Sequence, residues 1–525
     1  RESRFPSPPT PLPQGERGER CSDPLPVGER VAEGRVRGRL HEENRLSPGQ
    51  QTSSLVKPFP SPPTPLPQGE RGARTDDPAE LLALRHAHGR VRDPYSNPNF
   101  SERESFRPSG DTPLSLPAEA KSPAVRCLVA AHNLNSPEGA PRYLSEIVLG
   151  LRDRGVLDPV VWSPLGGPGA AVYESVGVPV VVAGAEWSQR FVDGRWTPRE
   201  WEAAQSAVRK ALRDSKAEAV VANTLLTFPA VEAAARAGVP PVWVIHESYS
   251  TDVLNRVFPP FARGRLEAAF AMASRVIPAS HGTAELFSHW NTRGNFRVLH
   301  NGLDPRAFPP PNRPNLRSSR KNVIAVGTVC ERKGQHTLVE AAGILARKRS
   351  DFAVQLVGMR DGVPYANHVR ELIRRHRLEN VVFPITECDD ARPYFRAADV
   401  FVCTSHVETF SRAVLEAEAF GLPLVSTPVF GVPEQVFWGF NALPFDFGDA
   451  AGLASHLEKL LENDELRTAM GRKSRAAFEN HLDMDEMLDR YEAVILGAAR
   501  TGPRSRMKWV PPAAARPAVS LRKAG

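Results

Sequence analysis

Cysteine is scarce in this sequence. The five cysteines are scattered along the chain, and no two of them form a Cys-x-x-Cys pair. This spacing argues against a disulfide framework and against a cysteine-based zinc cluster. Unpaired cysteines fit a reducing compartment, so we expect a cytoplasmic protein. The five stand at Cys21, Cys127, Cys330, Cys388 and Cys403.

Long hydrophobic runs are missing as well. No run of about 18 apolar residues occurs, so the sequence predicts no membrane-spanning helix. The N-terminal stretch RESRFPSPPTPLPQ has no apolar core, and we therefore do not expect it to act as a signal peptide.

A basic surface is absent from the central part of the chain. Of the net charge of +7, none comes from residues 1–120, which carry 17 Lys/Arg and 17 Asp/Glu. Residues 501–525 carry six basic residues and no acidic one, so the central 380 residues carry about +1. This distribution argues against a nucleic-acid partner. The basic tail is either a solvated, disordered end or a peripheral contact with the anionic inner face of the cell membrane.

The first 120 residues are rich in proline. They hold 20 of the 50 prolines, and the stretch FPSPPTPLPQGERG occurs at 5–18 and again at 59–72. Such sequence buries too little apolar surface to offset the entropy lost on folding, so we expect disorder. A Pro-x-x-Pro ligand for a partner domain is the alternative. The first methionine is Met272, from which we expect this head to be translated upstream sequence.

Short apolar segments alternate with helical patterns from Ala124 onward. Segments such as VRCLVAA and VVWSP read as buried parallel strands, and PREWEAAQSAVRKALRDS reads as a helix. NFRVLHNG is predicted to be a further strand. The alternation stops at a proline-rich linker and then restarts, which predicts two doubly wound, Rossmann-like α/β domains facing across a cleft. The expected domains are 121–310 and 322–500, joined by a linker at 311–321.

A strand-to-helix corner in the second domain carries the first site motif. In AVGTVCERKGQHTLVEAA, Gly327 ends a strand, Lys333 follows in the loop, and Gly334 is expected to let the backbone approach a ligand. The N–H groups of the next helix and the lysine charge favour a phosphate. The alternative is an ordinary turn with a solvated lysine.

A pair of glutamates forms the second motif. In HVETFSRAVLEAEAFGLPLVST, Glu408 lies near the start of a helix and Glu416 lies within it. Eight positions along a helix span about 12 Å, which exceeds the roughly 5–9.5 Å between the carboxylates of a glycoside hydrolase. The spacing suits two carboxylates that grip a long polyhydroxyl ligand, with phosphate near the N–H groups of Phe410, Ser411 and Arg412. The alternative is a surface helix with two solvated glutamates.

Together these motifs resemble the retaining glycosyltransferases of family 4, which have the GT-B fold. The resemblance covers residues 125–497. ETFSRAVLEAEAFGLPLV is similar to the family's glutamate, seven residues, glutamate signature, and VGTVCERKGQ is similar to its Lys-Gly loop. VLHNGLDPRAF, EGAPRYL and VIHES are similar to further segments of the family.

The resemblance implies roles for individual residues. Lys333 would neutralise a donor diphosphate, Glu416 would hold the ribose and Glu408 the donor sugar. Gly139 would let the backbone pass near the sugar phosphate, and His246 would lie near the reacting sugar. Without the family, His246 reads as a structural histidine. The implied catalytic residues are His246, Glu408 and Lys333, and the implied donor-binding residues are Gly139, Gly327, Thr328, Arg332, Lys333, Gly334, Glu408, Thr409, Phe410, Ser411 and Glu416.

Two positions depart from the family pattern. The loop arginine of the family is Thr328 here, and Arg332 and Arg412 are the candidates to replace its charge. The usual double glycine of the acceptor loop is Glu138-Gly139, which is expected to change how a ligand sits there.

The implied reaction moves a hexose from a nucleotide-diphosphate-sugar to an acceptor hydroxyl with retention, in cell-surface glycan or glycolipid synthesis. The acceptor would be a glycan or a lipid-linked saccharide. The cleft motifs hold no Asp-x-Asp pair, so we expect no metal and no cofactor beyond the co-substrate. Two alternatives are a nucleotide-sugar-binding protein that has lost catalysis and a GT-B nucleotide-sugar epimerase.

Overall fold

The computed structural model describes residues 123–134, 139–184, 196–309, 320–481 and 483–500. The predicted head (1–120), the basic tail (501–525), most of the linker and Glu138 lie outside these residues. Both sheets described below belong to the same compact unit of the chain. No described helix is both long enough and apolar enough to cross a bilayer.

The first sheet has six parallel strands in the order β3-β2-β1-β4-β5-β6. Its central strands are buried along almost their whole length, as expected where helices cover both faces of a parallel sheet. The strands are β1 (Val125–Ala130), β2 (Leu157–Ser163), β3 (Val180–Val182), β4 (Ala219–Asn223), β5 (Pro241–Ile245) and β6 (Arg275–Pro278).

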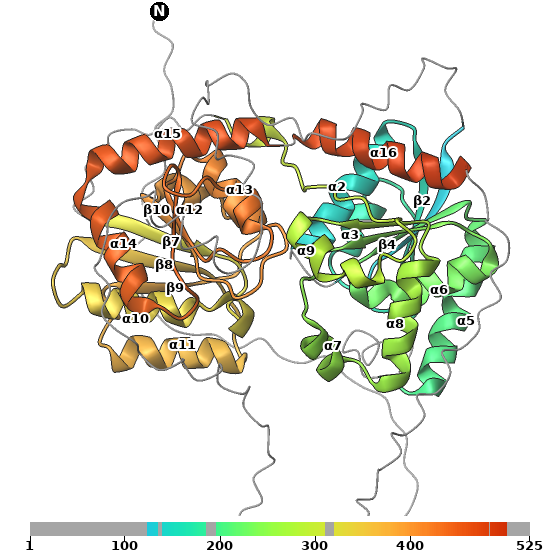
Figure 1. The fold of residues 1–525 in the computed structure, drawn as a ribbon, viewed down its shortest axis with the longest axis horizontal. Coiled ribbons are helices and arrows are strands. Elements are labelled where there is room, and N and C mark those ends of the chain that lie inside the picture. The colour runs from blue at the N-terminus through green and yellow to red at the C-terminus, as the bar shows by residue number, and fades with distance from the viewer. Residues whose placement is uncertain (1–122, 135–138, 185–195, 310–319, 482, 501–525) are drawn as a thin grey trace, which may run out of the picture. The chain divides into compact units, whose positions relative to one another are not determined.

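Amphipathic helices cover this sheet (Figure 1). The predicted helix PREWEAAQSAVRKALRDS is confirmed, and the side chain of Thr197 caps it by accepting from the N–H of Glu200. The helices are α2 (Gly139–Asp153), α3 (Ala170–Glu174), α5 (Pro198–Ser215), α6 (Phe228–Ala237), α7 (Thr251–Val257), α8 (Pro260–Met272) and α9 (His281–Leu286), with 3₁₀ turns η1 (Leu225–Thr227), η2 (Ser288–Trp290) and η3 (Pro305–Ala307).

The second sheet repeats the pattern with the order β12-β11-β10-β7-β8-β9, again all parallel. The chain reverses its direction of winding between β7 and β10, and ligands of such sheets bind at this point, beyond the carboxyl ends of the strands. The strands are β7 (Lys321–Val326), β8 (Phe352–Met359), β9 (Val382–Thr386), β10 (Val400–Cys403), β11 (Leu424–Ser426) and β12 (Ala442–Pro444).

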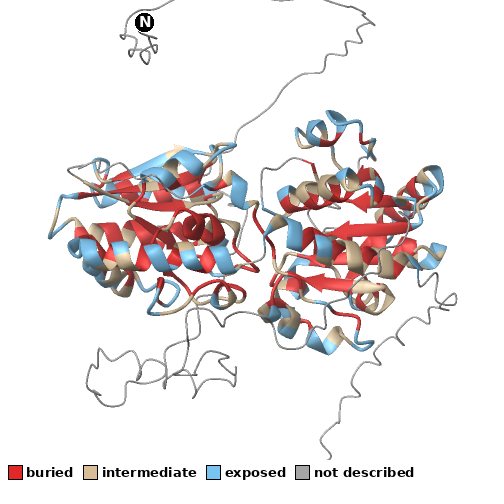
Figure 2. Cartoon of the chain, turned by 90° about the horizontal axis from the view of Figure 1, so that it is seen from above, coloured by how far each residue is buried: buried red, intermediate tan, exposed pale blue. Residues whose placement is uncertain are grey.

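The helices of the second half lie on both faces of its sheet, with their apolar sides toward the strands (Figure 2). The predicted α/β fold with two doubly wound sheets is thereby confirmed. The elements of this half are η4 (Glu331–Lys333), α10 (Gln335–Leu345), α11 (Pro364–Arg375), α12 (Arg392–Ala397), α13 (Arg412–Ala419), η5 (Val432–Glu434), α14 (Ala450–Glu462) and α15 (Asp464–Asn480). A last helix, α16 (Met484–Arg500), follows them in the chain.

The strand predicted over NFRVLHNG is wrong. This segment runs beside β6, and Val276 donates to the carbonyl of Asn295 and accepts from the N–H of Arg297. It forms a single bridge, between Val276 and Phe296, and no strand. The next donor on β6 would be Pro278, which has no N–H, so the ladder lacks this bond, although the Pro278 carbonyl still accepts from the N–H of Leu299 at 3.2 Å.

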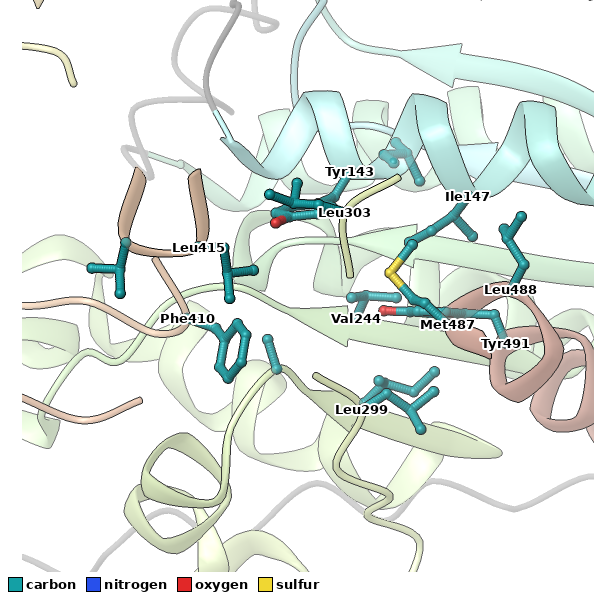
Figure 3. Packing of buried hydrophobic residues seen from close by; sticks show 14 of the residues in the cluster. Tyr143, Ile147, Val244, Leu299, Leu303, Phe410, Leu415, Met487, Leu488 and Tyr491 are labelled. Atoms are coloured by element: carbon teal, nitrogen blue, oxygen red, sulfur yellow. The ribbon is translucent and has the colours of Figure 1, made fainter. Parts of the chain in front are cut away.

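The C-terminal helix α16 departs from the predicted domain division. The prediction grouped it with the second sheet, yet its apolar side packs on the first half of the chain, beside α2 (Figure 1). Met487, Leu488 and Tyr491 lie beside Ile147 of α2 (Figure 3). The chain therefore returns to its first half after completing the second sheet.

Candidate active site

A cavity of about 1120 Å³ is lined by residues that follow strands of both sheets. The contributing loops come after β1, β4, β5, β7, β8, β9 and β10. Ten of the eleven donor-binding residues expected from the sequence line it, as does His246, and Gly334 does not. The cavity thus brings together predicted residues as distant in the sequence as Gly139 and Glu416.

Lys333 and Glu408 form an ion pair inside this cavity. Oε1 of Glu408 accepts hydrogen bonds from Nζ of Lys333 and from the hydroxyl of Ser405. Nη1 of Arg332 lies 3.8 Å from the same oxygen. Burial alone would raise the pKa of Glu408, but the charges of Lys333 and Arg332 outweigh it and lower that pKa. Glu408 is therefore an ionised carboxylate whose Oε2 has no hydrogen-bond partner among the described residues.

Glu416 is positioned by an arginine one helical turn before it. Arg412 donates from Nε to Oε1 of Glu416 at 3.0 Å and from Nη1 to Glu146 at 2.8 Å. Its guanidinium also lies over the ring of Tyr143, 4.9 Å from the ring centroid. Burial raises the pKa of Glu416, and Arg412 partly offsets this effect. With two carboxylate partners, Arg412 has little charge left to replace the missing family arginine.

The loop between Glu408 and α13 differs from the prediction in two ways. Glu408 precedes the helix by four residues, so helical rise does not set its separation from Glu416. The predicted phosphate contact of the Ser411 N–H is contradicted, because this group donates to Oε1 of Gln435 at 2.7 Å. The N–H groups of Phe410 and Arg412 have no acceptor among the described residues, and they keep the predicted capacity to bind an anion.

His246 lies at the carboxyl end of β5 and faces the same cavity. Its carbonyl accepts from the Thr409 hydroxyl at 2.8 Å, which joins the two halves of the site. Its ring is parallel to that of Tyr143, with 6.4 Å between centroids. Burial lowers the pKa of His246 to about 4, with His132 adding to the effect, so the imidazole is neutral near pH 7. Its Nε2 has no hydrogen-bond partner within the described ranges.

The glycines of the opening loop have distinct roles. Gly327 lines the cavity at a φ of 135°, and a Cβ there would lie 3.3 Å from Cε of Lys333. Gly334 adopts a φ of 63° and faces the carbonyl of Thr404 and the ring of Phe447, where a side chain would collide. The expectation that Gly334 admits a ligand is therefore wrong: its conformation and its packing both require glycine.

Glu247 is a cavity residue that the sequence prediction missed. It follows His246, and its Oε2 accepts from the N–H groups of Leu225 at 2.9 Å and His246 at 3.1 Å. Burial raises the pKa of Glu247 to about 7, although these hydrogen bonds and the charge of Arg332 act in the opposite direction. The sequence signal for Glu247 was its position in VIHES, next to His246 at the end of a predicted strand.

A second missed group surrounds Thr328. The Thr328 hydroxyl donates to Oε1 of Glu387 at 3.1 Å. Arg360, just beyond β8, binds the same carboxylate through Nε at 2.8 Å and Nη2 at 2.9 Å. All three residues line the cavity. Arg360 lies near Thr328, the position where the family has an arginine, but Glu387 neutralises its charge. Of the two predicted replacements, Arg412 already binds two carboxylates, so Arg332 is the better candidate.

One Asp-x-Asp sequence, Asp483-Met484-Asp485, stands at the start of α16, outside the cleft motifs. Asp485 lines the cavity, and its Oδ1 is paired with Arg154 at 3.1 Å. Because Arg154 directly follows α2, this pairing helps to hold α16 beside the end of α2.

Two family descriptions match the sequence. "Glycosyltransferase Family 4" matches residues 137–307, and "Glycosyl transferases group 1" matches residues 311–477. The first match includes strands β2 to β6 of the first sheet, and the second spans most of the half with Lys333, Glu408 and Glu416.

Curated relatives match part of the chain. A D-inositol 3-phosphate glycosyltransferase of Arthrobacter sp. is 32% identical over 200 residues, which are 36% of this chain and 47% of that protein. The lipopolysaccharide core biosynthesis glycosyltransferase LpsE of Rhizobium meliloti is 29% identical over 218 residues, 41% of this chain and 62% of that protein. The matches thus span about half the length of these relatives.

The fold also matches solved structures. Anabaena HepE, crystallised in complex with UDP and glucose, is 22% identical and superimposes with a TM-score of 0.57. The match covers 70% of this chain and 98% of HepE. This likeness shows that the two chains share a fold.

Proposed function

Because this chain belongs to the GT-B glycosyltransferases of family 4, we propose that it transfers a hexose from a nucleoside-diphosphate sugar to an acceptor hydroxyl. The acceptor is a glycan or a lipid-linked saccharide, and the product is a cell-surface glycan or glycolipid. The relatives that act in lipopolysaccharide and inositol phosphate glycosylation support this class of reaction.

The observation that carries the proposal is the convergence of charge in one cavity. Arg332 and Lys333 lie in η4, Glu408 follows β10 and Glu416 lies in α13, yet all four line the same space. The cavity offers two cations for a diphosphate and two carboxylates that can accept hydrogen bonds from sugar hydroxyls. A volume of about 1120 Å³ exceeds the roughly 300–1,000 Å³ typical of ligand pockets, and it leaves room for a donor and an acceptor.

The residues act on different parts of the donor. Lys333 and Arg332 stabilise the negative charge that grows on the diphosphate as it leaves. Glu408 accepts from hydroxyls of the donor sugar through Oε2, since Oε1 already binds Lys333 and Ser405. Glu416 accepts from the ribose. His246, neutral near pH 7, is a hydrogen-bonding group for the reacting sugar and not a cation.

The transfer proceeds with retention. The bond between the anomeric carbon and the phosphate oxygen breaks, and the acceptor oxygen attacks the same face. The acceptor proton passes to the departing diphosphate. This step needs no protein nucleophile, in agreement with a cavity whose central carboxylate, Glu408, is held in an ion pair.

Metal-independent turnover is a prediction of this scheme, because Lys333 and Arg332 carry the charge that a metal would otherwise neutralise. Turnover at saturating donor should survive excess chelator. A loss of turnover that magnesium or manganese restores would show that the charge assignment is wrong.

A protein that binds nucleotide sugars without transferring them is the second candidate. It is favoured by one observation: Thr328 supplies no cation, and Arg360 beside it is neutralised by Glu387. Release of nucleoside diphosphate separates the two functions, because binding alone releases none.

The test is a panel of nucleotide sugars that vary in base and in sugar. Thermal shift identifies the donor, and chromatography then measures nucleoside diphosphate released with and without candidate acceptors. The proposal expects stabilisation by at least one donor, followed by diphosphate release. Stabilisation without release supports the binding protein, and a folded protein that no donor stabilises contradicts both.

A further inference from the structure

Two histidines and a glutamate meet outside the cavity. His281 begins α9, His300 follows β6, and Glu434 ends η5. One ligand atom from each lies within 4.8 Å of the other two. None of the three lines the cavity described above. The cluster joins the two halves of the chain, since the histidines belong to the first half and the glutamate to the second.

The carboxylate of Glu434 is fixed before any ligand binds. Its Oε2 accepts from the N–H of His281 at 2.9 Å, and its Oε1 accepts from the N–H of Gly282 at 2.8 Å. A carboxylate offers about four acceptor positions, and these bonds occupy two of them. Glu434 therefore has capacity for further partners at a defined position.

His300 points one ring nitrogen at this carboxylate. Its Nε2 lies 2.9 Å from Oε2 of Glu434, and its ring stacks on Phe410 with 4.7 Å between centroids. A neutral imidazole with its proton on Nδ1 would place two lone pairs face to face here. The contact therefore needs a proton on Nε2 or a cation shared by the two atoms.

A proton explains His300 and Glu434 but leaves His281 without a role. The His281 ring stands edge-on to the His300 ring, with 5.8 Å between centroids and an interplanar angle of 81°. The His281 side chain is exposed, and it has no hydrogen-bond partner among the described residues. A cation bound by both imidazoles and the carboxylate accounts for all three side chains together.

We propose that His281, His300 and Glu434 bind a divalent transition cation, with Zn²⁺ as the best fit. Two imidazole nitrogens and one carboxylate oxygen suit zinc, which takes four ligands, and water fills the fourth position. Ligation through His300 Nε2 requires the neutral ring to carry its proton on Nδ1, so that the Nε2 lone pair faces the cation.

The site connects to the active-site loop. His300 stacks on Phe410, and Gly431, three residues before Glu434, donates its N–H to the carbonyl of Glu408 at 3.1 Å. The cation would hold both contacts in place and tie the two halves of the chain together. This inference does not depend on the identity of the sugar donor or on transfer activity.

The test is a competition titration of the full chain with Zn²⁺ and a chromophoric chelator. His281→Gln removes one ligand, and His289→Gln is the matched control, an exposed histidine nearby that stands outside the cluster. Loss of an outer-shell partner already weakens metal binding by about 10–100-fold, so loss of His281 should weaken the site by about a hundredfold or more. His289→Gln should bind like the wild type.

Co²⁺ provides a second readout on the wild-type chain. Tetrahedral ligation gives visible absorption, which should appear with one equivalent of Co²⁺ and disappear on adding Zn²⁺ or in His281→Gln. The proposal fails if wild type and His281→Gln bind Zn²⁺ equally, or if the wild type shows no tetrahedral Co²⁺ spectrum. The contact between His300 and Glu434 would then be an ordinary hydrogen bond.

Discussion

Glu408 shows how charge is balanced at single residues of the site. The residue is only 6% exposed, and its carboxylate stays ionised because Lys333 and Arg332 lie beside it. The sequence predicted both Lys333 and Glu408 as ligand contacts from their motifs. It gave no sign that they pair with each other, because 75 positions separate them and only the sheet order brings β7 next to β10. Arg360 was missed for the same reason.

Glu247 leads to a pH-dependent prediction. Its pKa is raised from 4.5 to about 7, so between these values the folded state holds a proton that the unfolded state has lost. This group therefore lowers the free energy of unfolding as the pH rises from about 4.5 to 7. Glu247→Gln removes that penalty and retains an oxygen to accept from Leu225 and His246. The melting temperature of the variant relative to wild type should rise from pH 5 to pH 8.

Glu202→Gln is the control for this measurement, since it removes an exposed carboxylate from α5. A difference between Glu247→Gln and wild type that stays constant over the same pH range would contradict the assignment of a near-neutral pKa to Glu247.

At the scale of elements, the sequence was most informative where strands are buried on both faces. The runs that became β1, β4, β5, β7 and β8 are almost wholly apolar, which marks central parallel strands. The pattern failed over residues 295–302 because periodicity does not report a missing donor such as Pro278 on the neighbouring strand. It also failed for α16, whose amphipathic pattern predicts a buried side but not the surface that covers it.

The packing of α16 on α2 supplies a prediction about stability. Leu488 is 4% exposed and lies over Gly150, where an added Cβ would come within 2.6 Å of its Cδ1. Leu488→Ala leaves a cavity at this contact and should cost about 2–5 kcal/mol of unfolding free energy. Glu486→Ala, on the exposed side of the same helix, should stay within about 0.5 kcal/mol of wild type. Equal denaturation midpoints for the two variants would show that α16 is not docked on α2.

At the scale of the whole molecule, the two sheets contribute different parts of one site. The first provides Gly139 and His246, and the second provides Lys333, Glu408 and Glu416. The repeated alternation of strands and helices predicted this division. Composition also separated residues 1–120 from the rest, because their proline content and balanced charge leave little apolar sequence for a core.

A chain that starts at Lys121 tests that separation. Because the head is expected to contribute no core, the shortened chain should keep the melting temperature and the donor affinity of the full chain. The measurements are thermal unfolding and donor titration of both chains side by side. A lower value of either property in the shortened chain would show that the head contributes to the folded protein.

The central claim is that the cavity binds the diphosphate of a sugar donor through Lys333, and calorimetric titration of nucleoside diphosphates into the full chain tests it most directly. A charge-assisted contact of this kind contributes about 1.5–3 kcal/mol, so Lys333→Ala should weaken binding by roughly ten- to a hundredfold. Lys348→Ala, an exposed lysine paired with Glu458 away from the cavity, should bind like the wild type. Unchanged diphosphate affinity in folded Lys333→Ala would contradict the account.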